Sequence, residues 1–362
     1  MGRRFDFFKI KTMLTNEQIT EIREHLENAK NPVFFYDNDP DGFCSFILLQ
    51  RYIGRGRGII IKSFPSLDKS YFKRVEELNA DYIFVLDKPI IDKGFIELAE
   101  KANIPLVHID HHNVPKTEIK YYYNTYYVDK KYDPVSYLCY NISGKKEDMW
   151  IAAIGCVTDS FLPDFLDDFK KKFPELIDCN YKTAADILYN SLFGKICMIV
   201  SFAMKDKISN VVSMSRFFMN ATSAHDVFEE SKKSKIMLNR FEEINEKYQK
   251  ILKKAEESIS GDVLFFNYGG DLSISQYVAN ELFYKNPKKI IMVAYTRGNI
   301  SNISLRWEKD IRVAVVNAVA GIEGASGGGH EHASGARMTS DKVEEFKKRL
   351  LEEVGKVNQN KK

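Results

Sequence analysis

The chain has 362 residues, and its content of 44% hydrophobic and 28% charged residues excludes a disordered protein and fits a folded globular one. Fifty-three Lys and Arg residues against fifty Asp and Glu residues leave a net charge of +3, which excludes a strongly basic nucleic-acid coat protein. Five cysteines without a C-x-x-C pair exclude a disulfide framework and a zinc ribbon.

The first half of the chain alternates short apolar strands with helices. We predict helices over 15–29, 43–53, 72–78 and 94–102, and strands over 33–36, 59–61, 82–86 and 106–109. This alternation is typical of βαβ units around a buried parallel sheet. Residues 134–200 have no clear strand pattern, so we predict a helical cap there.

The second half begins with apolar residues at helical spacing between Ile236 and Ala255, which predicts a charged connecting helix. We then predict strands over 263–266, 290–295 and 303–306, a helix over 275–284, a Gly-rich loop over 324–335 and a final helix over 341–354. The length and this pattern predict four segments. They are an N-terminal helix (1–30), a doubly wound α/β domain (31–205), a helical connector (206–258) and a smaller α/β domain (259–362).

The segment Met1 to Leu14 is basic and aromatic, but it has no apolar h-region, so we expect no signal peptide. The longest apolar runs are far shorter than the ~20 residues that a membrane-spanning helix needs. We therefore expect a cytoplasmic protein without membrane contact, in keeping with a cysteine usage that fits a reducing compartment.

Acidic and histidine residues follow the ends of three predicted strands and of one helix. They are Asp37, Asp39 and Asp41; Asp87; Asp110, His111 and His112; and Asp159. Crowded carboxylates repel one another unless cations lie among them. Oxygen ligands with one imidazole suit Mn²⁺ or Mg²⁺, and two such ions ~3.5–4 Å apart can promote attack on a phosphodiester. His108 lies inside an apolar run, and we expect a buried strand residue there.

These motifs resemble those of the DHH phosphoesterase superfamily, in the subgroup with a C-terminal DHH-associated domain. The first motif resembles residues 37–42, the second Asp87, the third residues 110–112 and the fourth Asp159. The signature of the second domain resembles residues 327–335. The resemblance extends over residues 30 to 340 and implies a DHH catalytic domain joined by the connector to a DHH-associated substrate-binding domain.

The resemblance also implies ligands for two Mn²⁺ ions, with Mg²⁺ as the alternative. One ion would be held by Asp41, Asp87, His111 and Asp159, and the other by Asp39 and the bridging Asp87. Asp110 would orient its neighbours, and His112 would contact the scissile phosphate.

The sequence departs from many small phosphatases and nanoRNases of this superfamily at one position. They have a His four residues before the position of Asp39, where this chain has Phe35. Asp37 is the nearest replacement ligand, with oxygen in place of nitrogen. The RecJ-like branch resembles the sequence better, because its first motif reads Asp-x-Asp-x-Asp-Gly.

The Gly-rich loop and the strand before it are the candidate substrate-binding elements. Glycines let the backbone approach a ligand closely and expose N–H groups to an anion. The resemblance implies that Gly327, Gly328, Gly329, His330 and Arg306 bind a phosphate or a terminal nucleotide. Without the resemblance, a flexible surface loop is the better interpretation.

The leading hypothesis is a Mn²⁺-dependent phosphodiesterase that acts as an exonuclease on single-stranded DNA or RNA, including short oligonucleotides. One alternative is a phosphatase or phosphodiesterase for small nucleotides, such as 3′-phosphoadenosine 5′-phosphate or a cyclic dinucleotide. Another is a catalytically impaired scaffold in replication or repair, which would bind a protein partner. The retained Asp residues and the DHH triplet favour an enzyme.

Overall fold

The computed structural model describes residues 14–63, 65–116, 118–130, 132–229, 231–258 and 261–359. The chain divides into two compact units, Met1–Glu242 and Glu243–Lys362. The division lies inside helix α12 (Lys232–Glu257), within the segment predicted as the connector. The four predicted boundaries stay a prediction. Residues 1–13, for which we expect no signal peptide, lie outside the described residues.

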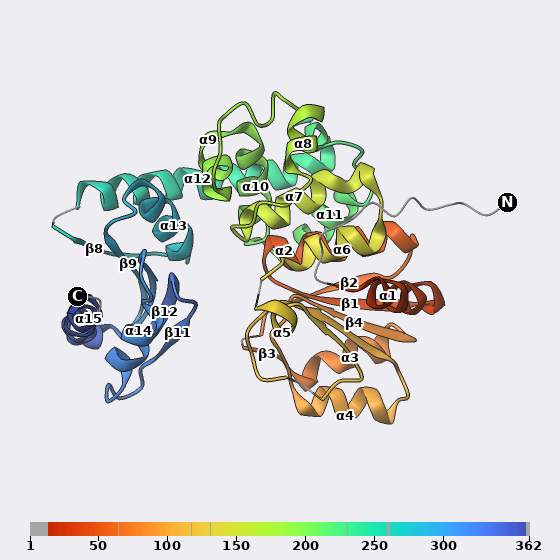
Figure 1. Ribbon diagram of the computed structural model, residues 1–362, viewed down its shortest axis with the longest axis horizontal. Coiled ribbons are helices and arrows are strands. Elements are labelled where there is room, and N and C mark those ends of the chain that lie inside the picture. Colours follow the sequence, from red (N-terminus) through yellow and green to blue (C-terminus); the bar gives the residue numbers. More distant parts are fainter. Residues whose placement is uncertain are drawn as a thin grey trace. The chain divides into compact units, whose positions relative to one another are not determined.

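A five-stranded sheet forms the centre of the first unit (Figure 1). Its strands are β1 (Pro32–Asp37), β2 (Arg57–Ile61), β4 (Tyr82–Leu86), β6 (Leu106–Asp110) and β7 (Tyr121–Asn124). They lie in the order β2-β1-β4-β6-β7, and all neighbours are parallel, as predicted. After β1 the chain forms β2 on one side of β1 and then β4 on the opposite side of β1. Open sheets bind ligands at the carboxyl edge beside such a reversal.

Helices cover both faces of this sheet (Figure 1). They include α1 (Asn16–Asn28), α2 (Pro40–Ile53), α3 (Phe72–Glu77), α4 (Lys93–Lys101), α6 (Val135–Ser143) and α7 (Met149–Thr158). Phe35 of β1 packs edge-to-face on Phe95 of α4, whereas the neighbouring Tyr36 stacks on Phe46 of α2. Because successive side chains of a strand point to opposite faces, β1 is buried between two helical layers. The doubly wound α/β fold is therefore confirmed.

The predicted helical cap is confirmed, because the described residues from 134 to 200 contain helices and no strand. The helices that follow α7 are α8 (Leu166–Lys172), α9 (Ala184–Asn190), α10 (Leu192–Ala203) and α11 (Ile208–Phe218). Helices α6 and α7 pack on α2, and Val135 and Ser136 of α6 contact Asp41 in the first turn of α2. The start of α6 therefore lies next to the N-terminus of α2, which follows β1.

The second unit is built on a mixed five-stranded sheet. Its strands are β8 (Val263–Gly269), β9 (Ile290–Arg297), β10 (Ile300–Arg306), β11 (Ser326–Gly329) and β12 (Ala333–Thr339), and its helices are α13 (Ser275–Lys285), α14 (Arg312–Val319) and α15 (Val343–Gln359). The order is β11-β12-β10-β9-β8. Only the pair β8–β9 is parallel among these neighbours. Trp307 and Phe346 lie in the hydrophobic core of this second unit.

The prediction of a Gly-rich loop over 324–335 was wrong. Residues of β11 pair with β12 in an antiparallel hairpin, with Gly328 opposite Gly335, and β12 also pairs with β10. Glycine lacks the side chain that identifies a strand, so its local pattern indicates a loop. Here the neighbouring strand β10 supplies the hydrogen-bonding partner. The sequence pattern likewise did not predict β12 or α14.

No single helix in the described part of the chain is long and apolar enough to cross a membrane. Helices α9 and α10 together pass a test of length and composition, but they are bent by 88° at their junction.

Candidate metal centre

The predicted acidic residues lie together at the carboxyl edge of the parallel sheet. β1, β4 and β6 are neighbours, so their last residues meet there. Asp37 ends β1, Asp87 follows β4 and Asp110 ends β6. Asp39 is the N-cap of α2, and its side chain accepts a hydrogen bond from the backbone N–H of Gly42.

Asp41 is held by the start of helix α6. Its carboxylate accepts hydrogen bonds from the backbone N–H groups of Val135 (2.8 Å) and Ser136 (2.9 Å) and from the Ser136 hydroxyl. Free N–H groups at a helix N-terminus stabilise a negative charge. These three contacts orient the Asp41 carboxylate and leave one of its about four acceptor sites, on Oδ2, for a cation.

Helix α7 approaches this carboxylate because it carries a glycine at the contact. A Cβ atom on Gly155 would lie 2.6 Å from Ser136 Cβ and 3.0 Å from Asp41 Oδ1, so a larger residue would push the helix away. Asp159 is the C-cap of α7, one turn after Gly155. The close packing at Gly155 therefore brings Asp159 to the cluster.

Asp87 is buried and has an unusual backbone conformation. Its φ of 57° lies in the left-handed region, which residues other than glycine occupy at a cost of about 1–2 kcal/mol. Its Oδ1 lies 3.3 Å from Nε2 of His111 and accepts no hydrogen bond from any residue that the structure describes. Such an orphaned oxygen in a strained turn points into the cluster as a ligand would.

Two groups of potential metal ligands share His111. They are Asp87, His111 and His112, and Asp41, His111 and Asp159; within each group the ligand atoms lie within 4.8 Å of one another. The carboxylate oxygens suit Mn²⁺ or Mg²⁺, and the imidazole nitrogens suit transition-metal ions. Together with the orphaned Asp87 oxygen, this donor set fits divalent cations.

The crowding of carboxylates raises their pKa values. Burial, and then the charges of Asp37 and Asp41, raise the pKa of Asp39 to about 6, although a hydrogen bond with Asp87 opposes this. Burial and the charge of Asp39 raise the pKa of Asp87 well above its usual range. Burial and Asp41 also raise the pKa of Asp159, although its side chain is 39% exposed. A bound dication would reverse these shifts, because it favours the charged carboxylates.

Asp110 and His112 form a separate pair at the edge of the cluster. Burial would raise the pKa of Asp110, but the hydrogen bond with His112 and the charge of that ring hold it at about 2. Burial would lower the pKa of His112, but the same hydrogen bond and the charge of Asp110 raise it. His112 Nδ1 lies 2.8 Å from Asp110 Oδ1. The Asn124 side chain donates to Asp110 Oδ2 (3.2 Å) and to the His112 carbonyl (3.0 Å).

Phe35 and Asp37 differ in their relation to the cluster. Phe35 is fully buried in the core between β1 and α4, where its ring packs on Phe95. Asp37 lies at the edge, but its Oδ1 is 2.9 Å from Nζ of Lys88. His108 is fully buried in β6, which confirms the prediction of a strand residue.

The candidate substrate-binding residues of the second unit lie on β10 and the β11–β12 hairpin. Arg306 ends β10, and its guanidinium donates to Asn280 Oδ1 (2.6 Å) and to the Leu305 carbonyl (2.7 Å). His330 is exposed in the turn between the hairpin strands, and its backbone N–H donates to the Ala333 carbonyl (2.9 Å). The structure thus places Arg306 and the hairpin in one sheet.

Two glycines of the hairpin have different surroundings. A Cβ on Gly327 would lie 2.9 Å from Val315 Cγ1 and 3.0 Å from Val319 Cγ1, so packing against α14 explains this glycine. A Cβ on Gly328 would meet no atom of a described residue within 4 Å. Packing within the described chain therefore does not explain Gly328.

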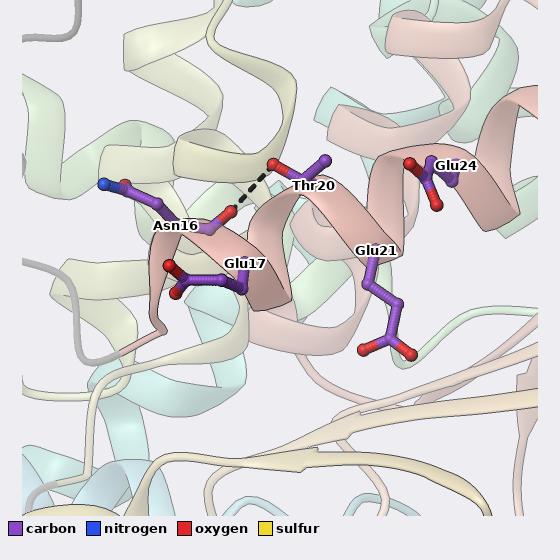
Figure 2. A pocket seen from close by; sticks show the side chains of 5 residues that line it. All are labelled: Asn16, Glu17, Thr20, Glu21 and Glu24. Carbon is purple, nitrogen blue, oxygen red and sulfur yellow. Dashed lines mark hydrogen bonds between the residues drawn. The ribbon is translucent and has the colours of Figure 1, made fainter.

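A hollow on the first unit has no part in the cluster. It runs along the surface of α1 and is lined by Asn16, Glu17, Thr20, Glu21 and Glu24, as Figure 2 shows. The Thr20 hydroxyl donates to the Asn16 carbonyl of the same helix. None of the predicted site residues lines it, and acidic residues of one exposed helix face do not by themselves make a site.

Several residues that support the cluster are not apparent from the sequence alone: Lys88, Asn124, Ser136 and Gly155. Ser136 and Asn124 had no local signal, since a Ser at a helix start and an Asn after a strand are common in any fold. Their roles depend on contacts with residues 14 or more positions away.

Comparisons with known proteins agree with this arrangement. A model of the DHH family, N-terminal domain, matches residues 33–159, and a model of the DHHA1 domain matches residues 258–356. The uncharacterized protein MJ0831 of Methanocaldococcus jannaschii is 39% identical over 72 residues, which are 18% of this chain and 17% of that protein.

Two solved structures of RecJ have a similar fold. RecJ from Thermus thermophilus in complex with Mn²⁺ matches 95% of this chain with 14% identity and a TM-score of 0.65, and this chain spans 54% of that protein. The exonuclease RecJ bound to manganese matches with 14% identity and a TM-score of 0.62, over 96% of this chain and 95% of that chain. The two family models together cover most of the chain, and the cluster lies within the first of them. The chain belongs to the DHH superfamily of phosphoesterases and carries a C-terminal DHHA1 domain.

Proposed function

We propose that this protein is a Mn²⁺-dependent phosphodiesterase that removes nucleotides from the ends of single-stranded DNA or RNA, including short oligonucleotides. The observation that carries the proposal is the gathering of Asp41, Asp87, His111 and Asp159 in two ligand groups at the carboxyl edge. Asp39 belongs to neither group, and its hydrogen bond with Asp87 supports its place among the ligands. The likeness in fold to an exonuclease bound to manganese supports both the reaction and the metal.

The proposed ligands of one ion are Asp41, Asp87, His111 and Asp159, and those of the other are Asp39 and the bridging Asp87. Divalent ions bound there would supply Lewis acidity, which polarises a phosphate and makes a nearby water molecule acidic. The chain's own contribution is to orient the ligands, through the α6 N-terminus at Asp41 and the strained turn at Asp87.

His112 is the proposed contact to the scissile phosphate. Asp110 accepts from Nδ1 of His112 and raises the pKa of this ring, which favours a proton on the opposite nitrogen, Nε2, as well. A protonated imidazole donates a charge-assisted hydrogen bond to a phosphate oxygen and stabilises the charge that develops there. In this proposal Asp110 is a positioning residue, and Asn124 holds the pair in place.

The proposed substrate contacts of the DHHA1 domain are Arg306, His330 and the glycines 327–329. The unexplained Gly328 supports this role, because a residue without a side chain allows a phosphate to approach the backbone N–H. The net charge of only +3 favours short substrates or few phosphate contacts, since each such contact normally recruits a Lys or Arg.

A nuclease assay tests the proposal. End-labelled single-stranded DNA and RNA of several lengths are incubated with Mn²⁺, Mg²⁺ or EDTA, and the products are resolved on a gel. We expect metal-dependent release of mononucleotides, loss of activity in His111→Ala, and unchanged activity in Asp168→Ala, which alters an exposed carboxylate of α8.

The same assay separates the alternatives. Hydrolysis of dinucleotides or of 3′-phosphoadenosine 5′-phosphate without cleavage of longer chains would identify a small-nucleotide enzyme. Absence of any metal-dependent hydrolysis would favour the scaffold with a replication or repair partner. Cytoplasmic location stays a prediction.

A further inference from the structure

A buried lysine lies directly beside the proposed metal centre. Lys88 follows Asp87, and its side chain is only 2% exposed. Its Nζ donates to Asp37 Oδ1 (2.9 Å) and to the Ser63 carbonyl (3.0 Å). Lysine is almost never buried to this extent unless it is paired with an opposite charge, and Asp37 supplies that charge here.

The main chain of Lys88 is also held in place. Its carbonyl lies 2.8 Å from Nε2 of His108, a fully buried residue of β6, and only the ring nitrogen can be the donor in this contact. Lys88 is thereby tied to the end of β1, the segment after β2 and the middle of β6. Because β1 and β6 flank β4 in the sheet, the contacts to these two strands hold Lys88 beside Asp37.

The ion pair between Lys88 and Asp37 involves the residue that would replace, as a ligand, the His that many small phosphatases and nanoRNases have at the position of Phe35. The side chain at position 35 is a phenylalanine in the core, whereas the charge of Asp37 acts on both Asp39 and Asp87, so Asp37 is the additional carboxylate that the second ion could use. One oxygen of Asp37 already binds an ammonium. A fixed positive charge at that position repels a dication that approaches the same carboxylate.

We propose that Lys88 keeps Asp37 out of the ligands of the second metal ion, so that Asp39 and Asp87 alone hold this ion and it is the weaker of the two. Lys88 is then a positioning residue, since its burial prevents contact with substrate. The inference rests on the two-ion site of the proposed function.

Calorimetric titration of the full-length, metal-free protein with Mn²⁺ tests the inference without use of activity. Lys88→Met keeps the length of the buried side chain and removes its charge. We expect the first ion to bind as in the parent protein, and the second to bind at least about tenfold more tightly, which corresponds to about 1.4 kcal/mol. A purely structural defect would weaken the second ion instead.

Asp37→Asn completes a double-mutant cycle. By itself it leaves the buried Lys88 ammonium without its partner, so it should weaken the second ion and should not strengthen either ion. In the Lys88→Met background it should remove the tenfold gain. Circular dichroism checks the fold, and if Lys88→Met does not fold, the double variant still decides, because it leaves neither charge unpaired. It should bind both ions as the parent protein does, and loss of the second ion in it would make Asp37 a ligand.

Other results overturn the inference. An unchanged or weaker second ion in Lys88→Met contradicts the role of Lys88, and a gain that persists in the double variant contradicts the role of Asp37. A parent protein that binds no Mn²⁺ contradicts the metal site of the proposed function as well. If the parent protein binds the first ion and His111→Ala does not, the metal site of the proposed function is supported, whatever the result for Lys88→Met.

Discussion

Replacement of Asp39 by Asn should stabilise the metal-free protein. In the folded chain, burial and the charges of Asp37 and Asp41 raise the pKa of Asp39 from 3.8 to about 6. A raised acid pKa means that the folded state binds this proton more tightly than the unfolded chain. The corresponding stability is complete below pH 3.8 and is lost as the pH rises through about 6.

The size of the effect follows from the two pKa values. The difference between 3.8 and about 6 corresponds to about 3 kcal/mol at 1.36 kcal/mol per tenfold change in proton affinity. Asn has nearly the shape of Asp, carries no charge and caps a helix equally well, so the hydrogen bond to Gly42 at the start of α2 is retained. Asp39→Asn should therefore be as stable as the parent near pH 4 and more stable by up to about 3 kcal/mol at pH 7.5.

Hydrogen exchange of the metal-free full-length chain measures this difference. Amides of β1 and β4 report on the first unit, and a comparison of the two proteins at each pH cancels the intrinsic exchange rate. Saturation with Mn²⁺ should reduce or reverse the difference, because the parent gains about 2.7 kcal/mol at a hundredfold excess over Kd whereas the variant lacks a ligand.

Asp110→Asn is a control of opposite sign in the same cluster. Here the folded pKa is lowered from 3.8 to about 2, so the stability from this carboxylate is present above pH 3.8 and is lost as the pH falls through about 2. This variant should be less stable than the parent by about 2 kcal/mol between pH 5 and 7.5. Crowding of carboxylates would be refuted as the dominant effect if Asp39→Asn had the same stability as the parent at every pH.

Three further predictions concern activity. Asp87→Asn keeps a residue type that tolerates the left-handed backbone, and it should lower hydrolysis of long and short substrates alike by at least about a hundredfold while the fold is kept, which circular dichroism checks. Arg306→Ala should lower kcat/KM about ten- to a hundredfold, and more for dinucleotides than for longer chains. Arg337→Ala, on the exposed side of β12, should not lower kcat/KM. If Arg306→Ala hydrolysed dinucleotides as fast as the parent protein, the phosphate contact would be ruled out. Gly328→Ala should leave the unfolding temperature unchanged but raise KM about tenfold. Gly327→Ala should lower the unfolding temperature, because the added methyl group would clash with α14. A Gly328→Ala protein with the KM of the parent would contradict a close approach of the substrate.

Much of the first unit could be predicted from local sequence. An apolar run that stops at an acidic residue predicts the strand at 82–86, and the acidic residue Asp39 marks the start of the helix after it. Short apolar strands that alternate with helices form a parallel sheet in most folds. Because parallel strands end at one edge, the convergence of Asp87, His111 and Asp159 was also predictable, although their roles as ligands stay a prediction.

The tertiary structure alone decided the remaining features. The Gly-rich segment is a hairpin because β10 supplies a partner for β12. Asp41 is oriented by the start of a helix 94 residues further along the chain, and Asp37 is paired with Lys88, which lies 51 residues away. Periodicity and motifs describe neighbours along the chain, whereas a buried carboxylate takes its charge state and its direction from neighbours in space. For this protein, local sequence therefore determines where the acidic residues gather, and the fold decides which of them are available to a metal ion.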